Sequence, residues 1–132
     1  MHHSPEPALN FYERQLGLPE IGSAGQARLQ SSAVLVIGAG GLGSPVLFNL
    51  AGAGVGRIGI VDVDAIAASN LNRQFLYTAA DIGQPKAEVA ANRIRAYHPD
   101  LVIEPFPLRL NEAHALDLFP SFDLIVACVD NN

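Results

Sequence analysis

Short apolar runs alternate with segments of helical character along most of the chain. Four runs rich in aliphatic and β-branched residues have the length and composition of strands buried in a parallel sheet, at 33–38, 57–62, 101–106 and 122–130. Between them, we predict helices that begin near Pro45 and Pro85, and a third over about 111–118. This alternation predicts an α/β fold with a doubly wound, Rossmann-like, mainly parallel sheet.

The first two predicted helices have apolar positions at helical spacing. In the first, these positions are Val46, Leu47, Leu50 and Ala51. Glycines at 52, 54 and 56 are expected to end that helix. In the second, the apolar positions are Ala87, Ala91, Ile94 and Tyr97. Pro99 disfavours helix before it, so the second helix should stop near 98.

A glycine-rich turn joins the first predicted strand to the first helix. Gly38, Gly40 and Gly43 form the pattern G-x-G-x-x-G, which permits a tight turn, close approach of a phosphate and use of the helix N-terminus as an anion site. Asp62 ends the second strand, where a carboxylate can accept hydrogen bonds from ribose hydroxyls. The alternative is that the glycines only let the helix pack on the sheet. If a nucleotide binds here, this pattern fits NAD and ATP equally.

Composition narrows the class of protein. A formal net charge of −5 argues against broad attraction to nucleic acid or anionic lipid. The apolar runs are far shorter than the roughly 20 residues that span a bilayer, and the N-terminus lacks the pattern of a secretory signal. The single cysteine, Cys128, cannot form an internal disulfide and reads as a small buried hydrophobe. We therefore expect a soluble, cytoplasmic protein.

Polar loops supply candidate phosphate ligands. Arg73 lies in NLNRQ and Lys86 in QPK, and phosphates require such cations, although each alone could be a solvated surface charge. Asn70 suits a ribose or phosphate contact, or a turn. Asp130, at the end of the fourth predicted strand, lies where doubly wound sheets bind ligands and could hold Mg²⁺ against phosphate oxygens.

Several spaced segments together resemble one family. They are YERQLGLPEIGSAGQARL, GAGGLGSP, ASNLNRQFLY, IGQPKAE and CVDNN, and they extend from about residue 11 to the last residue. In this combination the chain resembles the E1-like adenylyltransferases of molybdopterin and thiamine biosynthesis, the bacterial relatives of ubiquitin-activating enzymes. The resemblance favours ATP as the nucleotide.

The resemblance also implies site residues. The ATP contacts would be Gly41, Asp62, Ser69, Asn70, Leu71, Asn72, Arg73, Lys86, Asp130 and Asn131, with Asp130 holding Mg²⁺ and Gln74 supporting the loop. In this family an arginine of the N-terminal arm reaches the phosphates of the neighbouring subunit, and Arg14 is the matching position. The resemblance thus implies a homodimer in which Arg14, Arg73, Lys86 and Asp130 serve catalysis.

The implied reaction is attack by the C-terminal glycine carboxylate of a small ubiquitin-like sulfur carrier on the α-phosphate of ATP. We expect a helical arm over 1–32 and a nucleotide-binding half domain over 33–132, because family members continue beyond the point where this sequence stops. The paired C-x-x-C zinc ligands of the family are absent from this chain. On this reading the chain is truncated, and we expect it alone to bind carrier weakly and to catalyse little.

Two alternatives remain open from the sequence. A fragment of an NAD-dependent oxidoreductase would share the glycine turn and Asp62 but gives no reason for NLNRQ and QPK. A non-catalytic nucleotide-binding remnant would retain every motif. The sequence leaves open which sulfur carrier, that of molybdopterin or of thiamine synthesis, is the substrate.

Overall fold

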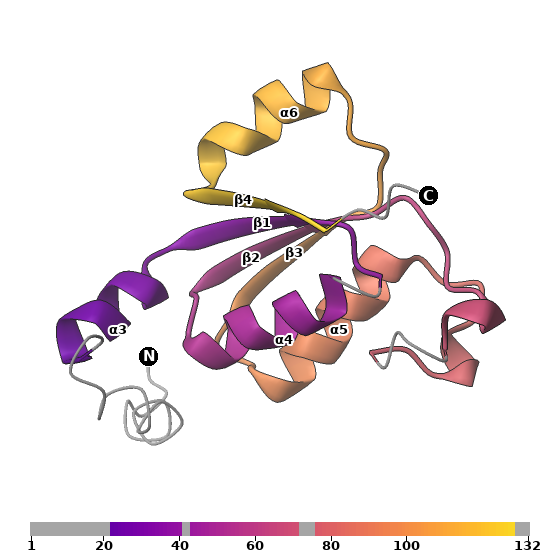
Figure 1. The fold of residues 1–132 in the computed structure, drawn as a ribbon, viewed down its shortest axis with the longest axis horizontal. Helices are drawn as coiled ribbons and strands as arrows, with labels where there is room; N and C mark the ends of the chain where they lie inside the picture. Colours follow the sequence, from indigo (N-terminus) through magenta and orange to yellow (C-terminus); the bar gives the residue numbers. More distant parts are fainter. Residues whose placement is uncertain (1–21, 41–42, 72–75, 129–132) are drawn as a thin grey trace.

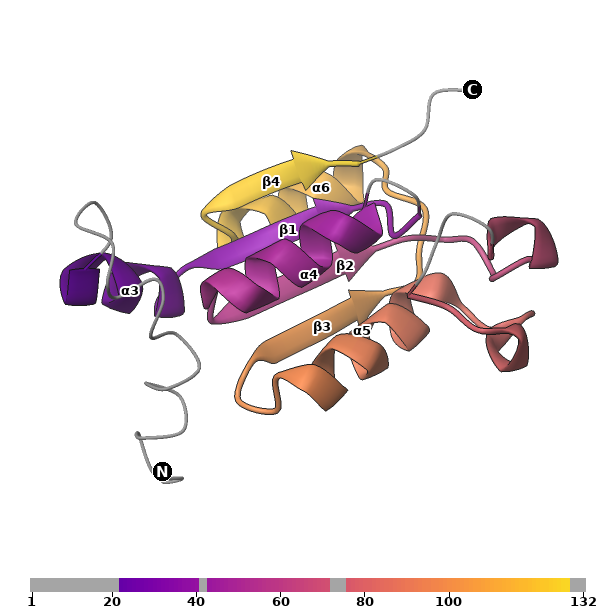
Figure 2. The same cartoon turned by 60° about the horizontal axis from the view of Figure 1, so that its bottom comes forward.

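A four-stranded parallel sheet forms the centre of the molecule. The computed structural model describes residues 22–40, 43–71 and 76–128. Its strands are β1 (Ala33–Ile37), β2 (Arg57–Val61), β3 (Val102–Phe106) and β4 (Leu124–Ala127). They lie side by side in the order β3-β2-β1-β4 (Figure 2). Every pairing is parallel, so the predicted doubly wound α/β class is confirmed.

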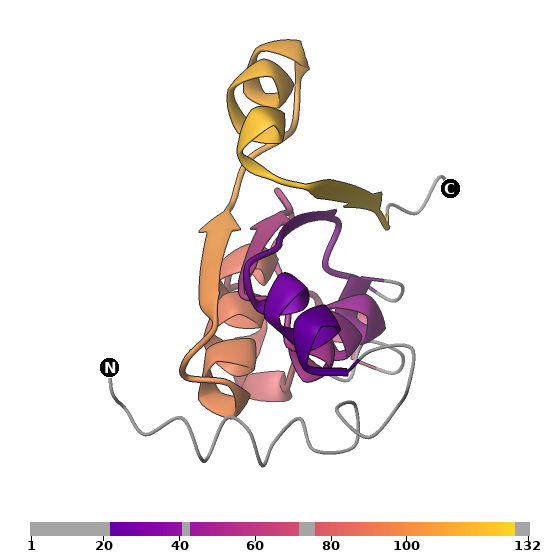
Figure 3. The same cartoon turned by 90° about the vertical axis from the view of Figure 1, so that its left-hand side faces the viewer.

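Helices cover both faces of this sheet. Helices α4 (Gly43–Ala53) and α5 (Lys86–Tyr97) lie on one face, and α6 (Glu112–Leu118) lies on the other (Figures 1 and 3). A further helix, α3 (Gly22–Gln30), lies beyond the amino end of β1. Each parallel connection needs a crossover, and a helix supplies it after β1, β2 and β3.

Side-chain alternation along β1 explains why both faces need cover. Val34 and Val36 belong to the core cluster under α4 and α5, whereas Ala33 and Leu35 belong to the cluster on the side of α6. Successive strand residues point to opposite faces, so an unbroken apolar run requires two apolar layers. The four residues are 0–8% exposed, which confirms the prediction of a strand buried on both faces.

Some predicted bounds and contacts were wrong. Of the glycines expected to end the first helix, Gly52 still lies within α4, which continues to Ala53, and Gly54 follows its last residue with φ +96°. Tyr97 is 65% exposed and packs edge-to-face on Phe48, with ring centroids 5.5 Å apart, so it does not join the core with Ala91 and Ile94. Tyr97 is the last residue of α5, and the buried residues of that helix end at Ile94.

The fourth strand is also shorter than its apolar run. β4 covers only Leu124–Ala127, and Leu124 is 54% exposed because β4 is the outermost strand of the described sheet. No helix among the described residues is long and apolar enough to cross a membrane. The division into an arm over 1–32 and a domain over 33–132 stays a prediction.

Candidate nucleotide-binding site

The glycine turn lies at the carboxyl edge of the sheet, between β1 and α4. Gly38 has φ +99°, which favours glycine, and its N–H donates to the carbonyl of Val61 at 2.8 Å. The carbonyl of Gly40 accepts from the N–H of Ser44 at 2.9 Å, which starts α4. A Cβ at Gly43 would lie 1.9 Å from the carbonyl oxygen of Gly38. The turn and the helix start are therefore in direct contact, which requires glycine at 43.

Asp62 fixes this turn from the end of β2. One carboxylate oxygen, Oδ2, accepts from the N–H of Ala39 at 2.8 Å. The other, Oδ1, accepts from the N–H of Asp64 at 2.8 Å. Asp62 is half-buried, so its carboxylate is also near solvent. The predicted ribose ligand thus lies beside the glycine turn and has a structural task as well.

The segment after β2 brings several predicted residues to the same edge. Ser69 and Asn70 lie in a short 3₁₀ turn over Ala68–Asn70, and the Oδ1 of Asn70 accepts from the N–H of Ala67 at 2.9 Å. That oxygen therefore closes the turn, which was the second role considered for Asn70 beside a ribose or phosphate contact. Leu71 is half-buried and packs against the core cluster under α4 and α5, which anchors the segment.

Lys86 is buried at the start of α5, with 7% of its surface exposed. Its backbone N–H donates to the carbonyl of Asp64 at 2.9 Å, and Asp64 donates to Asp62, so hydrogen bonds link the start of α5 to the glycine turn. Within the described ranges, no acceptor or carboxylate pairs with the ammonium group. A buried cation without a partner is costly, and lysine is seldom buried unless paired. This arrangement suits a ligand that supplies negative charge.

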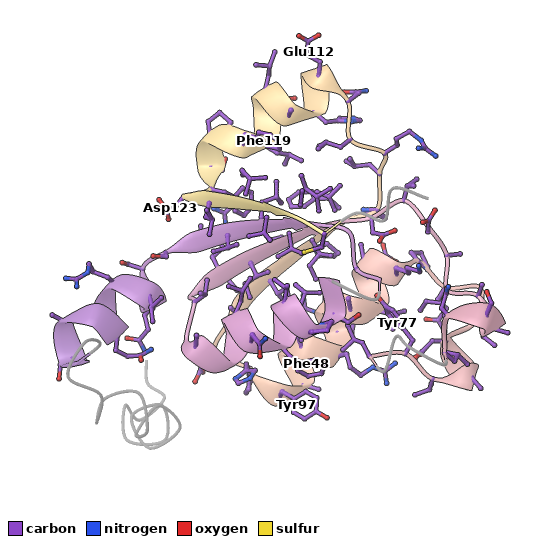
Figure 4. All side chains as sticks on the ribbon, viewed as in Figure 1. Phe48, Tyr77, Tyr97, Glu112, Phe119 and Asp123 are labelled. Atoms are coloured by element: carbon purple, nitrogen blue, oxygen red, sulfur yellow. The ribbon has the colours of Figure 1, made fainter. Side chains whose placement is uncertain are left out.

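The sequence analysis missed Tyr77, which also holds the glycine turn. Its hydroxyl donates to the carbonyl of Ala39 at 2.5 Å, and its side chain is buried. Burial, with a smaller contribution from the charge of Asp62, raises the pKa of the Tyr77 phenol above its ordinary value, and a hydrogen bond with Ser44 opposes this in part. The sequence feature that could have identified it is a tyrosine at the end of the apolar run FLY, because a buried tyrosine hydroxyl needs a hydrogen-bond partner. Figure 4 shows Tyr77 on the side of the sheet covered by α4 and α5.

The remaining predicted site residues lie outside the described residues. They are Arg14, Gly41, Asn72, Arg73, Gln74, Asp130 and Asn131. No group of three histidine, cysteine, aspartate or glutamate side chains that could hold a metal ion occurs in the described part of the chain. Their predicted roles, including Mg²⁺ on Asp130, stay predictions.

Cys128 follows the end of β4 and is half-buried, so the prediction of a small buried hydrophobe within the strand was wrong in both respects. Its N–H donates to the carbonyl of Ile37 at 2.7 Å. Burial raises the pKa of the Cys128 thiol above its ordinary value, which opposes formation of the nucleophilic thiolate. This arrangement disfavours a catalytic cysteine at this position.

We expect Cys128 to react slowly with iodoacetamide near neutral pH. Because the pKa of its thiol is raised, the thiolate fraction at pH 8 lies below that of an unperturbed cysteine. The alkylation rate should be several-fold below that of the urea-unfolded chain at the same pH, and it should still be rising at a pH where the unfolded chain has reached its plateau. A native rate equal to or above the unfolded rate at pH 8 would contradict this.

The fold and the turn define a class of protein: doubly wound α/β proteins with a nucleotide-type glycine turn at the carboxyl edge of the sheet. The ThiF family model matches residues 12–132. The chain belongs to the ThiF family, which confirms the resemblance inferred from the sequence.

Relatives of known name agree with this assignment. A sulfur carrier protein adenylyltransferase of Thermus thermophilus is 49% identical over 123 residues, which make up 93% of this chain and 45% of that protein. The probable adenylyltransferase/sulfurtransferase MoeZ of Mycobacterium tuberculosis is 49% identical over 91% of this chain and 31% of its own length. The chain therefore spans less than half the length of these relatives.

Solved structures share the fold. E. coli MccB with ATP aligns with a TM-score of 0.73 and 31% identity over 80% of this chain and 31% of that one. The E. coli tRNA N6-threonylcarbamoyladenosine dehydratase TcdA in complex with ATP aligns with a TM-score of 0.87 over 96% of this chain and 51% of that one. At 24% identity, TcdA supports the fold alone.

Proposed function

We propose that this chain binds ATP at the glycine turn and contributes the nucleotide site of an adenylyltransferase that activates a ubiquitin-like sulfur carrier. One observation supports it above the others: the side chain of Lys86 is buried with no partner for its ammonium among the described residues, and hydrogen bonds link its backbone through Asp64 and Asp62 to the turn. A phosphate chain would supply the missing partner. The relatives named as adenylyltransferases, and MccB with ATP, point to the same nucleotide.

In the proposed reaction, the C-terminal glycine carboxylate of the carrier attacks the α-phosphorus of ATP. A new carboxyl O–P bond forms, the bond between the α-phosphorus and the bridging oxygen breaks, and pyrophosphate leaves with that oxygen. The nucleophile is already ionised, so the step requires no general base. Catalysis would be electrostatic and positional, with Lys86, Arg73 and the partner subunit's Arg14 stabilising charge on the phosphates.

The finer parts of this proposal rest on the family resemblance. They are Mg²⁺ on Asp130, a homodimer that shares Arg14, further nucleotide contacts from Ser69 to Gln74, and a carrier of either molybdopterin or thiamine synthesis. Asp130 lies outside the described residues, which themselves hold no group of three side chains suited to a metal ion.

Thermal unfolding of the purified chain with ATP or with NAD tests the proposed nucleotide. We expect millimolar ATP, with Mg²⁺ present, to raise the unfolding temperature, because a ligand at about 100 times its Kd stabilises by about 2.7 kcal/mol. NAD at the same concentration should leave it unchanged. Stabilisation by NAD and not by ATP would support the oxidoreductase alternative and overturn the proposal. Exchange of labelled pyrophosphate by this chain, when carrier is supplied, would support the adenylation step and would contradict the expectation that the chain alone catalyses little.

A further inference from the structure

We propose that Tyr77 is a positioning residue that ties the segment after β2 to the glycine turn and so holds the turn ready for the phosphate chain. This inference rests on the proposed function. Its basis is the hydrogen bond from the Tyr77 hydroxyl to the carbonyl of Ala39, which joins residues 38 positions apart in the sequence. Tyr77 is only 4% exposed, and Ala39 is fully buried.

Three side chains hold the backbone of Ala39. Its N–H donates to the carboxylate of Asp62 at 2.8 Å. Its carbonyl accepts from the Tyr77 hydroxyl at 2.5 Å and from the Ser44 hydroxyl at 3.3 Å. These side chains come from the end of β2, the segment that follows it, and the first turn of α4. Ala39 is therefore the residue through which three elements set the shape of the turn.

The turn needs such support because its own residues restrain it little. Gly38 and Gly40 flank Ala39, and glycine gains the most conformational freedom when a contact is lost. Without the Tyr77 hydroxyl, the longer bond from Ser44 would be the one side-chain hydrogen bond that the described residues still give to the buried carbonyl of Ala39. A buried acceptor that loses its better partner destabilises the arrangement that buried it. The expected consequence is a turn that samples other conformations.

The environment of the phenol keeps it a hydrogen-bond donor. Burial and the neighbouring Asp62 carboxylate both favour the protonated hydroxyl, so the pKa of Tyr77 lies above the ordinary range and the bond persists at every pH at which the protein would be assayed. The bond therefore acts as a fixed tie and not as a pH switch.

The position of Tyr77 in the chain suggests a role beyond stability. It ends the segment that contains Ser69, Asn70 and Leu71, and the glycine turn is the other part of the proposed site. The bond joins these two parts directly. Phosphates approach the turn most closely, so loosening the turn should weaken binding of the phosphate chain and leave binding of the nucleoside unchanged.

Titration calorimetry of Tyr77→Phe with ATP and with adenosine tests the inference. The substitution removes the hydroxyl and keeps the buried ring. We expect the Kd for ATP to rise about five- to tenfold, as for the loss of one buried hydrogen bond, while the Kd for adenosine changes less than about twofold. Ser44→Ala, which deletes the longer bond to the same carbonyl, should raise the Kd for ATP by a smaller factor. It also gives a second reading if Tyr77→Phe does not fold.

A matched control is Tyr97→Phe, because it removes the same hydroxyl from a tyrosine that is 65% exposed and whose ring packs on Phe48 (Figure 4). It should bind ATP and adenosine as the unmodified chain does. The inference is overturned if Tyr77→Phe binds ATP normally, or if it loses ATP and adenosine equally, as a general structural defect would cause. An unmodified chain that binds no ATP would instead overturn the proposed function, and the inference with it.

Discussion

Replacing Lys86 with methionine should abolish most ATP binding while leaving the nucleotide-free chain as stable as before, or more so. The two effects have one cause. The side chain of Lys86 is buried, and no described group pairs with its ammonium, so holding the charge there costs free energy in the absence of a ligand. Methionine has a similar length and no charge to bury. A residue whose role is ligand binding should weaken ATP binding without lowering stability when it is replaced. A residue whose role is packing should lower stability.

The expected sizes separate these outcomes clearly. A charge-assisted hydrogen bond to phosphate contributes about 1.5–3 kcal/mol, so the Kd for ATP should rise about 10- to 100-fold. The free energy of unfolding without nucleotide should stay within error or increase by about 1 kcal/mol. Urea denaturation and calorimetry measure the two quantities separately.

Arg109→Met is the matched control for charge. Arg109 is exposed, and its substitution also removes one positive charge from a chain of net charge −5. It should change neither the free energy of ATP binding nor the free energy of unfolding by more than about 0.5 kcal/mol. If Lys86→Met destabilised the chain strongly and bound ATP normally, Lys86 would be a structural residue and the main support for the proposed function would be lost.

Lys86 is also the only lysine in the sequence, which gives an independent measurement. An amine-specific reagent can then modify only Lys86 and the N-terminal amine. Burial predicts slow modification of Lys86 in the native chain, and bound ATP should slow it further.

The elements of this fold were predictable because their patterns are local. The apolar run of β1 predicts a strand buried in a parallel sheet. The glycines at 38 and 43 predict a tight turn between that strand and a helix. The exposure of Tyr97 was not predictable, since helical spacing places it on the apolar face and only the packing of α5 shows that the core ends before it. Periodicity predicts which face of the helix a side chain lies on. How far the core extends along that face depends on the tertiary structure.

The site divides in the same way. The carboxylate of Asp62 and the charge of Lys86 could be identified from their place beside known motifs. The tie from Tyr77 to Ala39 could not, because the acceptor is a backbone carbonyl and alanine carries no side-chain signal. The burial of Lys86 was equally hidden, since a lysine in a polar loop reads as solvated until the structure shows otherwise.

Substituting Gly43 with alanine should disrupt the packing of the glycine turn against the start of α4 and should abolish ATP binding. The added Cβ would lie 1.9 Å from the carbonyl oxygen and 2.8 Å from the carbonyl carbon of Gly38. Both are backbone atoms of the turn, so no side chain can rotate away, and either the turn or the start of α4 must move. Gly38 cannot move freely, because its N–H is bonded to the carbonyl of Val61.

The same helix provides a control of opposite sign. At Gly52 an added Cβ would meet nothing within 4 Å, and the position is exposed. Gly52→Ala should therefore stabilise the chain by about 0.5–1 kcal/mol through helix propensity and reduced freedom of the unfolded chain. Gly43→Ala should instead destabilise the chain by about 1–3 kcal/mol, because the cost of overpacking against the backbone exceeds the gain in helix propensity. Urea denaturation of the two variants thus measures one chemical change at two positions of one helix. Equal stability in the two variants, with ATP bound by both, would show that the turn can yield and that it is not the rigid phosphate site proposed above.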